Sequence, residues 1–141
     1  MAMAENGKKT LTIALMDPPY ESETTTTALR IIDAALRKGI NVNVFAYEGA
    51  VNLTMKGQSP HPNPVKGTTV EDQDHPTTAR FISGLFGMSG EAAKLEWTNC
   101  GLCVDERGAG DWIEGPKRGG PGDLYKWSQE STNTLIIGTG R

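Results

Sequence analysis

The sequence is poor in the features that mark several classes of protein. It has only two cysteines in 141 residues, too few for the disulfide framework of a small secreted scaffold. Its apolar runs are a few residues long, far short of the roughly 18–20 residues that a membrane span needs, and its first residues lack the apolar stretch of a signal peptide. We therefore expect a cytoplasmic protein that makes no contact with a membrane.

Positive charge is also scarce. Lysine and arginine number 14 against 17 aspartates and glutamates, which gives a formal net charge of -3. Proteins that bind nucleic acid usually carry a basic patch, so this balance argues against direct binding of DNA or RNA. Neither a P-loop nor a complete dinucleotide fingerprint occurs in the sequence, and we expect no cofactor.

The composition is that of a folded domain. Hydrophobic residues make up 37% of the chain and charged residues 22%, which excludes the low hydrophobicity and high charge of a disordered protein. The length predicts a single domain over residues 1–141. Within it, residues 1–9 are expected to be disordered, and the proline-rich residues 56–75 are expected to form a long surface loop.

The order of periodic segments predicts an α/β fold. Runs rich in β-branched and apolar residues predict strands over 10–16, 41–47, 95–99 and 134–137. Helical spacing predicts helices over 28–36 with Ser22 as N-cap, from Pro76 to 87–90, over 91–94, over 102–107 and around 124–128. The glycine-rich residues 115–122 are either a mobile cover or a connector. Alternating strands and helices are typical of a three-layer sandwich with a mainly parallel sheet.

The two cysteines lie together, as Cys100-Gly101-Leu102-Cys103, where a predicted strand meets a predicted helix. Open parallel sheets place reactive groups at this kind of junction, and the positive end of a following helix favours a thiolate. Arg107 is a candidate to stabilise that thiolate, whereas the neighbouring Asp105 and Glu106 would oppose it. The alternative is that both cysteines are buried structural residues, as cysteines often are.

Two other chemistries use paired cysteines. The C-x-x-C spacing occurs in thioredoxin-like oxidoreductases, but there the motif follows an early strand, and here it lies in the last third of the chain. For a zinc site, only His61 and His75 could complete the ligand set, and their spacing matches no Cys2His2 module. We therefore expect no metal site.

The tryptophans invite a separate interpretation. With the acidic net charge, Trp97, Trp112 and Trp127 are better explained as core or subunit-interface residues than as a surface on which bases stack.

Taken together, several segments make the chain similar to the DsrE/DsrF/TusD-like sulfur-relay proteins. They are the turn Asp17-Pro18-Pro19-Tyr20, the helical ALRIIDAALRKG, the strand-like NVNVFAYEGAVN, and the segment from Cys100 to Arg107-Gly108. The chain departs from the family pattern at Cys103, at the long insert 57–74, and at the acidic Asp105-Glu106.

The resemblance implies a flavodoxin-like, DsrE-type topology and a role in cytosolic sulfur trafficking. It implies that Cys100 holds sulfur as a persulfide, with Cys103 as an accessory thiol, and that Tyr20, Glu48 and Gly49 belong to the binding site. Partners would be a sulfur donor protein and an acceptor protein, and the chain would form a homotrimer or homohexamer.

Two alternatives stay open. One is a non-enzymatic, oligomeric binding module in which the cysteines are inert. The other is a thiol-disulfide oxidoreductase that uses Cys100 and Cys103 to carry electrons rather than sulfur atoms.

Overall fold

Five short strands pair side by side at the centre of the protein, whose computed structural model describes residues 7–60, 67, 69 and 76–139. All four pairings are parallel, in the order β4-β3-β2-β1-β5. The strands are β1 (Thr10–Leu15), β2 (Asn41–Ala46), β3 (Leu95–Cys100), β4 (Lys117–Gly119) and β5 (Asn133–Ile137). Because all the strands are parallel, their carboxyl ends meet at one edge of the sheet.

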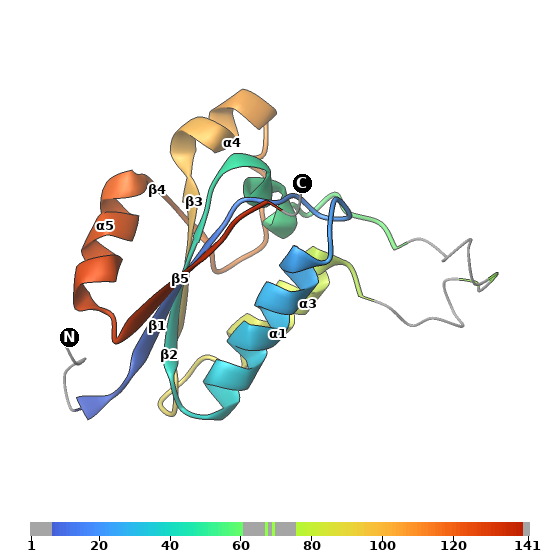
Figure 1. The fold of residues 1–141 in the computed structure, drawn as a ribbon. Helices are drawn as coiled ribbons and strands as arrows, with labels where there is room; N and C mark the ends of the chain where they lie inside the picture. Colours follow the sequence, from blue (N-terminus) through green and yellow to red (C-terminus); the bar gives the residue numbers. More distant parts are fainter. Residues whose placement is uncertain (1–6, 61–66, 68, 70–75, 140–141) are drawn as a thin grey trace.

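Helices cover both faces of this sheet (Figure 1). They are α1 (Thr24–Arg37), α3 (Thr78–Gly87), α4 (Gly101–Arg107) and α5 (Pro121–Glu130), with a 3-10 helix, η2, at Glu48–Thr54. Helices α1 and α3 lie on one face and α5 on the other, while α4 lies beyond the end of β3. This confirms the predicted three-layer α/β sandwich. Its strand order differs from the 2-1-3-4-5 order of flavodoxin itself, because β2 lies inside the sheet.

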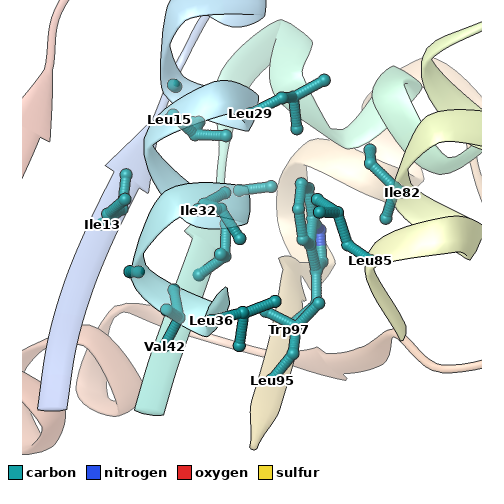
Figure 2. Close-up of a cluster of buried hydrophobic side chains, with 14 of the residues drawn as sticks. Ile13, Leu15, Leu29, Ile32, Leu36, Val42, Ile82, Leu85, Leu95 and Trp97 are labelled. Atoms are coloured by element: carbon teal, nitrogen blue, oxygen red, sulfur yellow. The ribbon is translucent and has the colours of Figure 1, made fainter. Parts of the chain in front are cut away.

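The hydrophobic core lies between the sheet and the α1–α3 layer. One stripe of α1 is buried because its apolar residues recur every three or four positions, and Ile32 at its centre is fully buried. Figure 2 shows Trp97 of β3 close to Leu85 of α3, within the same cluster. Burying one side chain of the size of Ile32 contributes about 1.5–3 kcal/mol, so this layer is the main source of stability.

The opposite face of the sheet is more polar. Buried Thr12 hydrogen-bonds Ser131 through their hydroxyl groups, and the Asn43 side-chain amide donates to Thr12 at 3.4 Å. Every residue of α5, including Trp127, is at least partly exposed to solvent. Helix α5 therefore covers its face of the sheet much less completely than α1 and α3 cover theirs.

A second, smaller apolar cluster joins η2 to α4. Val51 of η2 is buried against Val104 of α4 and Ala109, and Cys103 and Trp112 pack against this group. The cluster fixes the position of α4 relative to the end of β2. Of the three tryptophans, Trp97 is in the core, while Trp112 and Trp127 are half-buried.

The predicted start of α1 is wrong by one residue. Glu23, not Ser22, occupies the N-cap position, and it makes no side-chain capping bond. The Ser22 hydroxyl instead donates to the Asp17 carboxylate at 2.6 Å. The carboxylate at the end of β1 thus engages the serine that the spacing had assigned to the cap.

The predicted helix over 91–94 is also wrong. The Gly90 N–H bonds the Ala93 carbonyl, and the Lys94 N–H donates to the Asn41 side chain, so the segment is a tight turn leading into β3. Within the glycine-rich residues 115–122, the chain forms the edge strand β4, which the sequence pattern did not reveal.

Two further predictions fall largely outside the described residues. Most of the proposed loop 56–75 is not described, and neither are residues 1–6 of the proposed disordered terminus. Within the described part, the Lys9 carbonyl accepts a hydrogen bond from the Asn41 N–H, and the Lys8 ammonium donates to the Glu91 carbonyl. In the ranges that the structure covers, no helix is both long and apolar enough to cross a membrane.

Candidate functional site

The carboxyl edge of the sheet brings together residues that are far apart in sequence. The parallel register pairs Leu15 with Ala46 and Ala46 with Asn99, so the segments after β1, β2 and β3 emerge side by side. Cys100 is the last residue of β3 and immediately precedes α4. The strand-to-helix junction predicted for Cys100 is therefore present.

Both cysteines are free thiols, but their surroundings differ. Cys100 is buried, with 6% of its surface exposed, whereas Cys103 is half-buried in the first turn of α4. The Glu48 backbone N–H donates to the Cys103 sulfur at 3.1 Å. This bond ties α4 to the start of η2, where Glu48 itself has a positive φ of 52°.

Cys103 tends to keep its proton. Burial is the largest effect and raises the pKa of the Cys103 thiol, whereas the Glu48 N–H lowers it. The neighbouring Cys100 raises it further, and the net result is an increase. The Cys103 thiol is therefore the neutral member of its surroundings near neutral pH, and its position is fixed by the hydrogen bond from the Glu48 backbone.

Arg107 lies on the Cys103 side of the site. It follows Cys103 by four residues, which places both on one face of α4. Its guanidinium lies 3.3 Å from the Glu48 carboxylate and 3.6 Å from that of Glu106. Arg107 thus supports the segment that donates to Cys103, while its predicted contribution to a Cys100 thiolate stays a prediction.

The cation next to Cys100 in the fold is Arg118, which sequence reasoning missed. The register pairs Cys100 with Gly119, so Arg118 of β4 lies beside the end of β3. Its guanidinium forms two hydrogen bonds to the Asp105 carboxylate, at 2.9 and 2.7 Å. The pairing lowers the pKa of Asp105 and raises the pKa of Arg118, to which the charge of Cys100 adds a smaller increase. Asp105 was expected to oppose a thiolate, but Arg118 neutralises it.

The other predicted binding residues occupy the same edge. Gly49 packs against the Pro18 ring so closely that a Cβ at position 49 would lie 2.8 Å from a ring carbon. This contact joins η2 to the turn after β1. Tyr20 is exposed in that turn, with a positive φ of 71°. The structure therefore brings Glu48 and Gly49 into the thiol region and leaves Tyr20 at the surface of the adjacent turn.

A metal site finds no support in the described residues. Across residues 7–60, 67, 69 and 76–139, no group of three or more histidine, cysteine, aspartate or glutamate side chains could hold an ion. His61 and His75, the two histidines considered as zinc ligands, lie outside those residues.

Comparison with known proteins settles the family. The family model described as DsrE/DsrF-like matches residues 9–136. The chain belongs to the DsrE/DsrF-like family. This DsrE/DsrF-like protein is 30% identical over 133 residues to an uncharacterised protein of Methanopyrus kandleri, with 93% of this chain and 96% of the relative covered. It is 29% identical over 128 residues to an uncharacterised protein of Methanocaldococcus jannaschii, with 89% and 97% covered.

Solved structures show the same fold. The crystal structure of the ychN protein from E. coli is similar with a TM-score of 0.67 at 20% identity, over 91% of this chain and 98% of that one. A protein of unknown function from Methanobacterium thermoautotrophicum is similar with a TM-score of 0.62 at 12% identity, over the same shares. At these identities the likeness concerns the fold alone, and it agrees with the α/β class predicted from the sequence.

Proposed function

We propose that this DsrE/DsrF-like protein is a sulfur carrier that holds sulfur as a persulfide on Cys100 and passes it to a partner protein. The observation that carries the proposal is the pair of free thiols at the carboxyl edge, with Cys100 at the strand-to-helix junction and Cys103 in the first turn of α4. Membership of a family associated with sulfur relay supports it.

The chemistry needs one nucleophile and no redox cofactor. The Cys100 thiolate attacks the outer sulfur of a donor persulfide, R-S-SH, forming a new S–S bond while R-S⁻ leaves with the electron pair of the broken bond. An acceptor thiolate then attacks the outer sulfur on Cys100, becomes a persulfide, and releases the Cys100 thiolate. Both steps conserve sulfur, charge and electrons.

The limited exposure of Cys100 suits a carrier. A persulfide reacts with any free thiol that reaches it, and a sulfur on a residue only 6% exposed is shielded from such encounters. Cys103 could resolve the persulfide by attacking the inner sulfur of Cys100, which would release HS⁻ and form a disulfide. That attack needs the Cys103 thiolate, and the raised pKa of Cys103 keeps its population low near neutral pH.

A second candidate function uses the same pair of free thiols. In a thiol-disulfide oxidoreductase, Cys100 and Cys103 would cycle between a dithiol and a disulfide, and no sulfur atom would be gained. Cys100 at the N-cap of α4 and Cys103 in its first turn have the C-x-x-C spacing of redox-active cysteine pairs. The mass change separates the two functions, because a carrier gains sulfur whereas an oxidoreductase loses two hydrogens.

The direct test is intact-mass spectrometry of reduced protein after brief incubation with polysulfide. We expect wild type and Cys103→Ser to gain the mass of one or two sulfur atoms and Cys100→Ser to gain none. A gain that is indifferent to Cys100→Ser, or disulfide formation without any gain, would contradict the carrier function.

We also propose that the protein assembles as a homotrimer or homohexamer. The support is the lightly packed face around α5 and β5, where Tyr125 is 69% exposed and Ile136 is 56% exposed. Large apolar side chains at this exposure are common in subunit interfaces. Light scattering should give three or six times the chain mass in wild type and a smaller species for Ile136→Glu. A monomeric wild type would contradict this assembly.

A further inference from the structure

We propose that Arg118 is the residue that holds the anionic sulfur at Cys100, and that Asp105 is a built-in counter-ion that competes with that sulfur for the guanidinium. The inference deepens the proposed function, on which it rests, because it names the group that attracts an anionic sulfur donor to Cys100.

The first argument is geometric. A Cβ added to Gly101 would lie 2.8 Å from the Cζ, Nε and Nη2 atoms of Arg118. The guanidinium therefore fills the space that a side chain would occupy on the residue directly after Cys100. The parallel register sets this position, because Cys100 pairs with Gly119, the neighbour of Arg118 in β4. A glycine at position 101 leaves the guanidinium room beside the end of β3.

The second argument concerns hydrogen-bonding capacity. A guanidinium has five N–H donors, and Asp105 engages Nη1 and Nη2 of Arg118 with one short bond each. Donors remain for a second anion. Both side chains are about half exposed, at 53% for Arg118 and 59% for Asp105, so their ion pair is weak enough to exchange with a ligand.

The third argument is access. Arg118 also lines a groove of about 690 Å³ along β3, β4 and α5. The other charged residues of its lining are Lys94, Lys117, Lys126, Glu91, Glu96 and Asp123. The side chain that lines this groove is thus the one whose guanidinium packs against Gly101, the residue after Cys100.

Arg107 provides an internal comparison because it belongs to α4, the helix that carries Asp105, and also pairs with a carboxylate. Its partner, Glu48, contacts Cys103 through the backbone, and its guanidinium is less exposed, at 30%. If any arginine near the thiols were enough to attract an anion to Cys100, removing Arg107 and removing Arg118 would weaken that attraction equally. The fold predicts that they differ.

Thiosulfate is a convenient anionic donor. The Cys100 thiolate attacks its outer sulfur, the S–S bond to the sulfonate breaks, and sulfite leaves with the bonding electrons. The products are a Cys100 persulfide anion and sulfite, so charge and sulfur balance without an oxidant or reductant. Donor, thiolate and product are all anions, and a guanidinium at this position lowers the repulsion between them.

The test uses two alkylating reagents of similar size, iodoacetate and iodoacetamide, which differ in charge. The ratio of their rates at Cys100, followed by peptide mass mapping, reports how strongly the site attracts an anion and does not depend on sulfur chemistry. We expect Arg118→Ala to lower this ratio about fivefold, Arg118→Lys to lower it less, and Asp105→Asn to raise it about twofold. Arg107→Ala should lower the ratio less than Arg118→Ala does, and Arg37→Ala, which removes the exposed arginine paired with Asp33 on α1, should leave it unchanged.

The opposite signs for Arg118 and Asp105 are the decisive feature. If the ion pair were only structural, both variants would change the ratio in the same direction. An unchanged ratio in Arg118→Ala, or equal losses in Arg118→Ala and Asp105→Asn, would overturn the inference.

Thiosulfate loading of the same proteins keeps the two proposals distinguishable. Loading of wild-type Cys100 together with an unchanged alkylation ratio in Arg118→Ala would overturn the inference and leave the carrier function standing. The predicted ratios without any loading of wild type by thiosulfate or polysulfide would support the role of Arg118 in binding anions and contradict the carrier function.

Discussion

The carboxyl edge of the sheet has two sides, one around each cysteine, which contain the same kinds of residue but hold them by different contacts. Each side contains a thiol, an arginine–carboxylate pair and a glycine in tight contact with a neighbour. The Cys100 side comprises Cys100, Gly101, Asp105 and Arg118, and the Cys103 side comprises Cys103, Glu48, Gly49 and Arg107. On the Cys103 side the contacts are with a backbone N–H and a proline ring, whereas on the Cys100 side the contact is with the end of a long, half-exposed side chain.

This difference separates a structural role from a chemical one. The backbone of Glu48 and the ring of Pro18 have little freedom to move, so they hold Cys103 and η2 in one arrangement. A guanidinium can shift and exchange partners, so Arg118 can respond to a change of charge on the neighbouring sulfur. The sequence spacing of the two cysteines gives no sign of this asymmetry.

The largest expected effect is on stability, and it falls on the Cys103 side. In Gly49→Ala, the new methyl group would lie 2.8–3.0 Å from three carbons of the Pro18 ring, which cannot rotate away. We expect the free energy of unfolding to fall by about 2 kcal/mol, measured by urea denaturation. A urea midpoint equal to that of wild type would show that the contact between Gly49 and Pro18 adjusts as easily as the contact between Gly101 and Arg118.

The same substitution on the Cys100 side should behave differently. In Gly101→Ala, the methyl group would displace the Arg118 guanidinium, a flexible group, and alanine is a better helix former than glycine. We therefore expect unchanged or increased stability in urea, together with thiosulfate loading of Cys100 slowed about threefold. Loss of stability comparable to that of Gly49→Ala would contradict the contrast between the two sides.

The smallest expected effect concerns the coupling between the two thiols. Cys100→Ala removes a hydrogen bond and a charge that both raise the pKa of Cys103, while burial and the Glu48 N–H remain. The pKa of Cys103 should therefore fall, and its iodoacetamide alkylation should accelerate on the acid side of its titration. The pH profile of that rate measures the shift.

Leu102→Ala is the matched control for this coupling. Leu102 lies between the cysteines and is 73% exposed, so its truncation should leave the profile unchanged. A Cys103 profile that stays in place or moves to higher pH in Cys100→Ala would show that the thiols do not interact as the structure indicates.

Much of the fold was predictable because periodicity reports burial. The apolar stripe around Ile32 identified α1, and β-branched runs identified β1, β2 and β5. Strand β4 was not predictable, because its three residues, Lys117–Gly119, have no apolar pattern and pair with β3 only through the tertiary fold. The turn over 91–94 was mistaken for a helix because its residues favour helices locally, whereas hydrogen bonds to distant groups decide its shape.

Only those parts of the site that lie close to the cysteines in sequence could be predicted. The position of Cys100 at a strand-to-helix junction followed from the pattern around it. Arg107 drew attention because it is near the cysteines in sequence, although four-residue spacing already placed it with Cys103. Arg118 lies 18 residues after Cys100 and reaches it through strand register, a relation that becomes visible once β4 is known.

The location of sulfur in the loaded wild-type protein tests the central claim most directly. After incubation with polysulfide, the thiols would be alkylated, the protein digested, and the peptide containing both cysteines fragmented in the mass spectrometer. The account predicts the added sulfur on Cys100, with Cys103 carrying only the alkyl group. Sulfur on Cys103, or a Cys100–Cys103 disulfide with no added sulfur, would contradict it.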